Sequence, residues 1–166
     1  MHPATHPTAL RVQEAGRALG LDLDVLEFDA STRTAEEAAA AVGCTVGQIV
    51  KSLVFSVAGK PVICLVSGSN RLDERKLAAW AGVGRKQVER ADAEIARTAT
   101  GYAIGGVAPF GYPQPLPVLC DEDLFQHEVI WAAAGTPNAV FETTPQALAA
   151  ATGAVVASLA LQQERV

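Results

Sequence analysis

The sequence predicts a single α/β domain of the mixed α+β type, in which helices cover a mixed β-sheet. Short apolar runs bounded by turn residues indicate strands, and helical patterns stand at irregular intervals between them. Neither a strict strand–helix–strand alternation nor an internal repeat is present. The length of 166 residues suits one domain and no linker divides it, so we expect residues 1–166 to form one unit.

Capping patterns predict the helices of the first half of the chain. Thr8 begins a run with apolar residues at helical spacing, and Gly20 ends it. Thr34 and Glu37 form a capping-box pattern before an alanine-rich helix that Gly43 closes. Two helices are therefore expected before the first long apolar strand.

Strand patterns accompany these helices. Residues 21–29 begin by alternating apolar and acidic side chains, as a strand with one solvated face does. Residues 52–57 and 61–66 are apolar and flank Ala58-Gly59-Lys60, which is a hairpin signal. We expect both hairpin strands to be central, with a short helical turn over residues 46–50 before them.

The second half of the chain continues this mixture. An amphipathic helix over residues 72–80 follows a break at Gly68-Ser69-Asn70, and Thr144 begins a helix with Pro145 at its favoured first position. The other expected elements are a short strand over 83–88, a brief helix over 92–97, an acidic turn over 121–123, a turn over 135–138, and strands over 116–120, 127–134, 139–142 and 155–159.

The segment from Gly101 to Gly111 is unusual for a loop, because it holds four glycines and a proline but no charged residue. Glycine permits positive φ angles and close approach of the backbone, and Pro109 fixes its own φ. One interpretation is a rigid binding wall whose backbone N–H groups face a cleft. The other is a strand that enters a tight turn, and these residues leave both open.

Charge and hydropathy restrict the classes of function. The net charge of −5 argues against general nucleic-acid affinity, because such affinity rests on lysine and arginine. Seven of the thirteen basic residues lie between Arg71 and Arg97, and the acidic residues among them leave two interpretations, a phosphate-facing patch or a solvated helix face. No apolar run approaches the roughly 20 residues that span a bilayer, and no secretion signal is present, so we expect a cytoplasmic protein without membrane contact.

The residues that commonly bind metals are sparse. The three cysteines are odd in number and widely spaced, so we expect small buried side chains and neither a disulfide nor a thiolate site. His2 and His6 lie in a terminus that we expect to fray, which leaves only His127 within the fold. We therefore expect no metal and no cofactor.

Lys51 is the most informative charge, because it lies between the apolar segment 46–50 and the strand that begins at Ser52. A lysine at the edge of an element usually extends its ammonium group to water. The functional alternative is a fixed positive charge at the rim of a pocket, suited to a phosphate or a carbonyl oxygen. Residue chemistry alone does not choose between them.

Three stretches of the sequence together resemble one family. They run from Gln48 to Phe55, from Gly101 to Gly111 and from Gly135 to Phe141, and their order and spacing are similar to the YbaK/EbsC/ProX family. Its members include free-standing aminoacyl-tRNA deacylases that edit in trans and the editing insertion of bacterial prolyl-tRNA synthetase. The resemblance extends over about residues 9–159, the expected core, and implies an α/β domain with a mixed, partly barrel-like sheet.

The resemblance implies hydrolysis of a mischarged aminoacyl-tRNA at the ester that joins the amino acid to the terminal ribose. By position, Lys51 matches the family's functional lysine, and residues 105–109 match its Gly-x-x-x-Pro loop, whose backbone lies by the ester. The resemblance favours a positioned water, or assistance from the ribose hydroxyl of the substrate, so no protein nucleophile is implied. The implied catalytic residues are Lys51, Gly105 and Gly106, and the expected substrate-binding residues are Phe28, Ser31, Thr32, Val107, Pro109, Gly135 and Thr136. For Phe28 the alternative is core packing, and for the three hydroxyl residues it is the capping of turns.

The implied substrate is a prolyl-type tRNA that carries a small wrong amino acid, and the implied partners are its acceptor end and prolyl-tRNA synthetase. Compared with the cysteine-editing branch, Leu26 and Thr34 stand where aromatic residues are expected, and Ala133 and Val140 where a serine and an aspartate are expected. Alanine or another small amino acid is therefore open beside cysteine. The alternative function is a non-catalytic module that binds an amino acid, a nucleotide or a synthetase.

Overall fold

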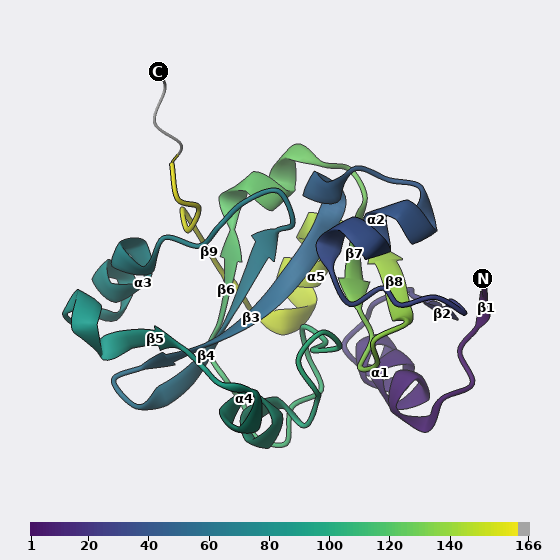
Figure 1. Cartoon of the computed structure of the whole chain (residues 1–166), viewed down its shortest axis with the longest axis horizontal. Coiled ribbons are helices and arrows are strands. Elements are labelled where there is room, and N and C mark those ends of the chain that lie inside the picture. The colour runs from purple at the N-terminus through teal and green to yellow at the C-terminus, as the bar shows by residue number, and fades with distance from the viewer. Residues whose placement is uncertain (163–166) are drawn as a thin grey trace.

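The computed structural model describes residues 1–162, which form one mixed sheet with helices on both faces (Figure 1). The helices are α1 (Pro7–Ala18), α2 (Ala35–Val42), α3 (Glu74–Ala81), α4 (Ala93–Thr100) and α5 (Pro145–Thr152). The strands are β1 (His2–Pro3), β2 (Val25–Glu27), β3 (Ile49–Val57), β4 (Lys60–Ser67), β5 (Val88–Arg90), β6 (Val118–Asp121), β7 (Ile130–Ala133), β8 (Ala139–Thr143) and β9 (Val155–Ala157). Short 3₁₀ turns occupy Val46–Gln48, Arg85–Gln87 and Glu122–Gln126. The predicted fold class is confirmed, and no helix in the described part of the chain is long and apolar enough to cross a bilayer.

β3 runs through the middle of the molecule (Figure 1). Within residues 1–162 the strand order is β1-β2-β8-β7-β3-β4-β6-β9, and β5 also pairs with β3. β3 is antiparallel to β4 and β5 but parallel to β7, which makes the sheet mixed. The β3–β4 hairpin turns at Ala58 and Gly59, both with positive φ, because such a turn matches the twist of the strands.

Side chains that alternate along β3 divide the core between the two faces of the sheet. Val50 and Val54 belong to the largest cluster, which α1, α4 and α5 cover. Phe55 and Val57 belong to a second cluster with α3, and Ile49 to a third with α2. The central strand is therefore covered on both faces, as its apolar sequence predicts.

The glycine segment, residues 101–111, is an irregular wall of the largest cluster and contains no strand. Val107, Ala108 and Phe110 are buried within it. The hydroxyl of Tyr102 donates a 2.9 Å hydrogen bond to the carbonyl oxygen of Phe110 and holds the two ends of the segment together. Its apolar composition thus reflects burial, and the interpretation as a strand that enters a tight turn is wrong.

The cap of α2 agrees with the sequence, but α1 is capped by His6 and begins at Pro7, so the expected cap at Thr8 is wrong. Strand ends differ as well. The Thr34 hydroxyl accepts a 3.1 Å hydrogen bond from the N–H of Glu37, and Gly43 ends α2 with a φ of 77°. The strand expected over 83–88 begins instead with a 3₁₀ turn, and the strand expected over 127–134 is confined to β7. Strand ends depend on the position of the partner strand, which local sequence does not encode.

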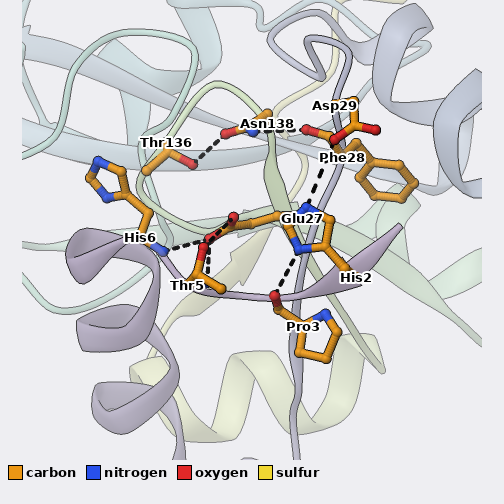
Figure 2. A network of polar contacts seen from close by, with 9 residues as sticks. All are labelled: His2, Pro3, Thr5, His6, Glu27, Phe28, Asp29, Thr136 and Asn138. Atoms are coloured by element: carbon orange, nitrogen blue, oxygen red, sulfur yellow. Dashed lines mark hydrogen bonds and ion pairs between the residues drawn. The ribbon is translucent and has the colours of Figure 1, made fainter.

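The N-terminus does not fray as predicted. β1 pairs with β2, and the buried Glu27 carboxylate accepts hydrogen bonds from the N–H groups of Thr5 and His6, at 2.7 and 2.8 Å (Figure 2). The His6 side chain then caps α1 by accepting a hydrogen bond from the N–H of Thr8. A single carboxylate therefore anchors the chain where it enters α1.

The three cysteines are free thiols. Cys64 and Cys120 are at most 1% exposed, and Cys44 is half-buried. The first two are small buried side chains, as the sequence predicts.

Candidate active site

One edge of β3 lacks a neighbouring strand over part of its length. β4 pairs with the other edge from Val50 to Val57. On the opposite edge, β7 pairs only with Ile49 and Val50, and β5 pairs only from Phe55 onward. We call residues 51–54, between β7 and β5, the strand gap. Apart from the carbonyl oxygen of Val54, which accepts a hydrogen bond from the N–H of Ala91, the backbone of this gap has no strand partner on that edge and is open to a ligand.

A cavity of about 370 Å³ lies at the strand gap. Ligand sites in proteins commonly measure roughly 300–1,000 Å³, so the cavity is large enough for a small molecule or one end of a larger one. α2 and the loop before it form part of its wall, β3, β7 and β8 form another part, and α4 and the glycine segment complete it. Segments far apart in the sequence therefore meet here.

The cavity wall is positively charged. Among the described residues, its ionisable side chains are Arg33, Lys51, Arg90 and Glu36. This local excess of positive charge contrasts with the net charge of −5 of the whole chain. It favours an anionic group, such as a phosphate, at the cavity.

Lys51 is half-buried, and its Nζ donates a hydrogen bond to the carbonyl oxygen of Asn70. The Asn70 side chain in turn donates a 2.8 Å hydrogen bond to Asp123. Burial lowers the pKa of Lys51, the positive charge of Arg90 lowers this pKa further, and the negative charge of Glu36 opposes both. The ammonium group is held at an energetic cost that a bound anion would reduce.

Gly105 places backbone at the cavity wall. Its φ is 92°, and a Cβ at this position would lie 2.3 Å from Cγ of Arg33, so the Arg33 side chain crosses directly over it. Within residues 1–162, the N–H groups of Gly105 and Val107 donate no hydrogen bond. Both residues line the cavity, which gives a ligand two candidate backbone donors.

Four of the predicted site residues line the cavity: Lys51, Gly105, Val107 and Thr32. The N–H of Thr32 donates a 2.7 Å hydrogen bond to the carbonyl oxygen of Pro137, and its hydroxyl donates to the same oxygen at 3.1 Å. Thr32 therefore fastens the loop before α2 to the turn between β7 and β8. Its contact with a substrate stays a prediction.

The other predicted site residues lie outside the lining: Phe28, Ser31, Gly106, Pro109, Gly135 and Thr136. Figure 2 shows Asn138 between two of them, because its Oδ1 accepts a 3.1 Å hydrogen bond from Thr136 and its Nδ2 donates one of 2.8 Å to the Phe28 carbonyl oxygen. Ser31 is exposed, and its hydroxyl accepts from the N–H of Arg33. Their predicted roles in catalysis and substrate binding stay predictions.

Sequence reasoning did not single out Arg33, Ser52 or Trp131, which also line the cavity. Ser52 had a signal, because it is a polar residue between Val50 and Val54, both of which face the largest core cluster. Arg33 had none, since its position depends on Gly105, which is distant in sequence. Trp131 had no such signal either, because in the sequence it is one of several apolar residues of an expected strand.

Three of the four positions that differ from the cysteine-editing branch line the cavity. These are Thr34, Ala133 and Val140, whereas Leu26 does not reach it. Ala133 and Val140 are direct partners across the β7–β8 ladder. The wall is therefore small and apolar where that branch is expected to be polar.

His127 lies outside this cavity, beside Gly47, where a Cβ would approach its Nε2 to 3.3 Å. It is half-buried. Among residues 1–162, no group of three or more histidine, cysteine or acidic side chains is arranged to hold a metal ion.

Comparisons with known proteins point to a single family. Residues 29–151 match the family model described as an aminoacyl-tRNA editing domain. EbsC of Enterococcus faecalis, named as a candidate Cys-tRNA(Pro)/Cys-tRNA(Cys) deacylase, is 31% identical over 132 residues, which cover 78% of this chain and 79% of that protein. A proline–tRNA ligase of a Thermoanaerobacter species is 30% identical over 99 residues, or 60% of this chain and 17% of the ligase. A crystal structure described as a candidate trans-editing enzyme for prolyl-tRNA synthetase is 49% identical, with a TM-score of 0.89 over 96% of this chain and 100% of that one.

Proposed function

Because the chain belongs to the aminoacyl-tRNA editing domain family, we propose that it hydrolyses mischarged aminoacyl-tRNA in trans. The observation that carries the proposal is that Lys51 and the backbone of Gly105 and Val107 line one cavity, although they are far apart in the sequence. The proposal takes residues 1–166 as one editing domain with its core at about residues 9–159. It places the protein in the cytoplasm, where aminoacyl-tRNA is used.

The cavity offers one set of groups to the phosphate of the substrate's terminal adenosine and another set to its aminoacyl ester. Lys51, with Arg33 and Arg90, suits the terminal phosphate. The N–H groups of Gly105 and Val107 suit the acyl carbonyl oxygen and the negative charge that develops on it during attack. The proposed roles of Lys51 and the glycine segment thus follow from charge and from free backbone donors.

The proposed reaction requires no nucleophile from the protein. A water molecule, held by the site or by the neighbouring ribose hydroxyl of the substrate, attacks the acyl carbon, and the bond from that carbon to the ribose oxygen breaks. After water attack the amino acid leaves as a carboxylic acid that loses its proton, and the ribose oxygen gains one. Catalysis rests on placing these groups and on stabilising the oxyanion.

The amino acid is proposed to be small, and the tRNA of the proline type. Ala38, Ala132, Ala133 and Val140 contribute short side chains to the cavity wall. The EbsC name specifies cysteine, and the solved relative is described in terms of prolyl-tRNA synthetase, which supports both parts of the proposal. Alanine and cysteine are the two candidates that this wall accommodates most simply.

The proposed partners are the acceptor end of the tRNA and prolyl-tRNA synthetase. The net charge of −5 argues for weak intrinsic affinity for tRNA outside the cavity. A synthetase that holds the tRNA would raise the local concentration of the ester.

The test is deacylation of proline tRNA charged with alanine, cysteine, serine or proline. We expect the wild type to accelerate release of at least one small wrong amino acid and to spare proline. Lys51→Ala should slow this release by about tenfold or more. Lys60→Ala, an exposed lysine in the adjoining hairpin and outside the cavity, is the matched control.

The outcomes separate the two candidate functions. No acceleration with any charged tRNA would favour the non-catalytic binding module. Full activity in Lys51→Ala would leave the deacylase standing but remove Lys51 from its mechanism.

A further inference from the structure

The hydroxyl of Ser52 is buried without a partner. Within residues 1–162, it is the one buried side-chain nitrogen or oxygen atom that makes no hydrogen bond. Buried polar side chains in proteins are almost always paired, because an unpaired one has lost its water without compensation. Ser52 lines the cavity of the candidate active site, so a ligand there could supply the missing partner.

The backbone of Ser52 faces the strand gap. The N–H of Ala91 donates a 3.0 Å hydrogen bond to the carbonyl oxygen of Val54, so the polar backbone groups of Val54 point to the edge of β3 that contains the gap. Residues two apart in a strand direct their N–H and C=O groups to the same edge. The N–H and C=O of Ser52 therefore point into the gap, where pairing with β7 has ended.

We propose that Ser52 binds the α-amino group of the aminoacyl ester, through its hydroxyl and its backbone carbonyl oxygen. This inference rests on the proposed deacylase function. In the sheet, a neighbouring strand would offer an N–H to the carbonyl oxygen of Ser52, and the substrate amine takes that position. A hydroxyl accepts a hydrogen bond from an ammonium group or donates one to a neutral amine, so it serves either form.

Apolar and cationic residues make up most of the rest of the cavity lining. Val54, Ala96 and Ala132 line the cavity together with Ser52 and offer no polar side-chain atom. The cationic Arg33, Lys51 and Arg90 repel an ammonium group and attract a phosphate, so charge orients the substrate with its amine away from them. Glu36, the one carboxylate among the described lining residues, attracts the ammonium group and adds to this orientation. Recognition of the amine is independent of the amino-acid side chain. It selects aminoacyl esters over esters whose amine is acylated, such as peptidyl-tRNA.

The test compares one aminoacyl-tRNA with its N-acetylated form. The amino acid is the one that the wild type releases fastest from proline tRNA, and the variants are Ser52→Ala, Ser52→Thr and the control Ser56→Ala. Ser56 lies on the same strand and face but pairs opposite Glu89 of β5, outside the cavity. We expect N-acetylation to lower kcat/KM of the wild type by about tenfold or more, the factor that a lost hydrogen bond to a polar group produces.

Ser52→Ala should lower kcat/KM on the aminoacyl-tRNA by about tenfold and leave the slow reaction of the N-acetyl form unchanged. Ser52→Thr, which keeps the hydroxyl, should retain most of the preference, and Ser56→Ala should retain all of it. An equal loss on both substrates in Ser52→Ala, or a wild type that hydrolyses both forms alike, overturns the inference while the deacylase stands. Thermal unfolding of each variant reports whether it is folded.

A binding measurement tests the inference even where no tRNA is hydrolysed. The probe is 3′-alanylamino-3′-deoxyadenosine, a stable amide analogue, with its N-acetyl derivative as control. Wild-type protein should bind the free amine about tenfold more tightly than Ser52→Ala does, and both proteins should bind the N-acetyl form alike. Equal affinity of the wild type and Ser52→Ala for the analogue with the free amino group overturns the inference about Ser52.

Discussion

The N–H of Gly135 donates a 2.8 Å hydrogen bond to the carbonyl oxygen of Gly106. This bond joins the glycine segment to the turn between β7 and β8. A Cβ at position 106 would lie 3.0 Å from backbone atoms of both Gly135 and Thr136, and backbone cannot move aside as a flexible side chain can. The contact therefore fixes Gly105 and Val107, the neighbours of Gly106, at the cavity wall.

We expect Gly106→Ala to lower both stability and deacylation. The added methyl group pushes the glycine segment away from the turn, at a cost of about 1–3 kcal/mol in the free energy of unfolding. Urea unfolding and deacylation of a mischarged tRNA measure the two effects. Gly84→Ala is the matched control, because Gly84 has a φ of −70° and open space around its Cβ position. A Gly106→Ala protein that matches this control in both assays would contradict the proposed role of the contact between the glycine segment and the turn between β7 and β8.

Helix ends could be predicted from the sequence because their causes are local. Thr34 caps α2 and Asp92 caps α4, each by accepting a hydrogen bond from an N–H three residues on. The strand gap could not be predicted, because it results from where β7 and β5 stop pairing with β3. Those strands are more distant in the sequence, and nothing within residues 51–54 marks the interruption.

The candidate site was predictable in part for the same reason. The resemblance pointed to Lys51 and to the glycine segment, and the structure brings Lys51, Gly105 and Val107 to one cavity. It did not point to Arg33, which crosses Gly105 only because the loop before α2 folds over the glycine segment. Such a contact depends on the tertiary fold, and the local sequence of either segment carries no record of it.

We expect Lys51→Met to abolish most deacylation without loss of stability at pH 7. Burial and the charge of Arg90 lower the pKa of Lys51 below its ordinary value of 10.5, so the folded protein holds this proton less firmly than the unfolded chain does. The protonated lysine therefore destabilises the fold at neutral pH, and this cost disappears as pH rises toward 10.5. Removing the charge should raise the free energy of unfolding by at most about 1 kcal/mol at pH 7, with a smaller gain at pH 10. Urea unfolding at both pH values checks the sign, and a variant that is clearly less stable at pH 7 is the contrary result.

We expect two of the three thiols to be unreactive in the folded protein. Burial raises the pKa of Cys64 to about 12, and burial together with the charge of Asp121 raises the pKa of Cys120 to about 12, so neither forms an appreciable thiolate at pH 8. A thiol reagent should modify at most Cys44, slowly, until denaturant exposes all three. Cys44→Ser should remove the native-state reaction, and rapid labelling of a second thiol in that variant would show that the core opens.

The charge of Glu27 should stabilise the N-terminal segment at neutral pH. Burial alone would raise the pKa of Glu27, but hydrogen bonds from the N–H groups of His6 and Thr5 lower it below the ordinary value of 4.5. The stabilisation is therefore fully present above pH 4.5 and is lost as pH falls through the pKa of the folded state. Glu27→Gln keeps the shape and one acceptor oxygen but removes the charge, so it isolates this contribution.

At pH 7, Glu27→Gln should unfold at lower urea concentration than the wild type, and the amide hydrogens of Thr5 and His6 should exchange faster, because a neutral oxygen accepts their hydrogen bonds more weakly. The difference between the two proteins should shrink at pH 3, because protonation of the wild-type carboxyl group increases as pH falls below 4.5. Asp22→Asn, which removes an exposed carboxylate from the loop before β2, controls for the change in net charge. A difference that is the same at both pH values would assign the effect to side-chain shape and not to the ionised carboxylate that anchors the entry to α1.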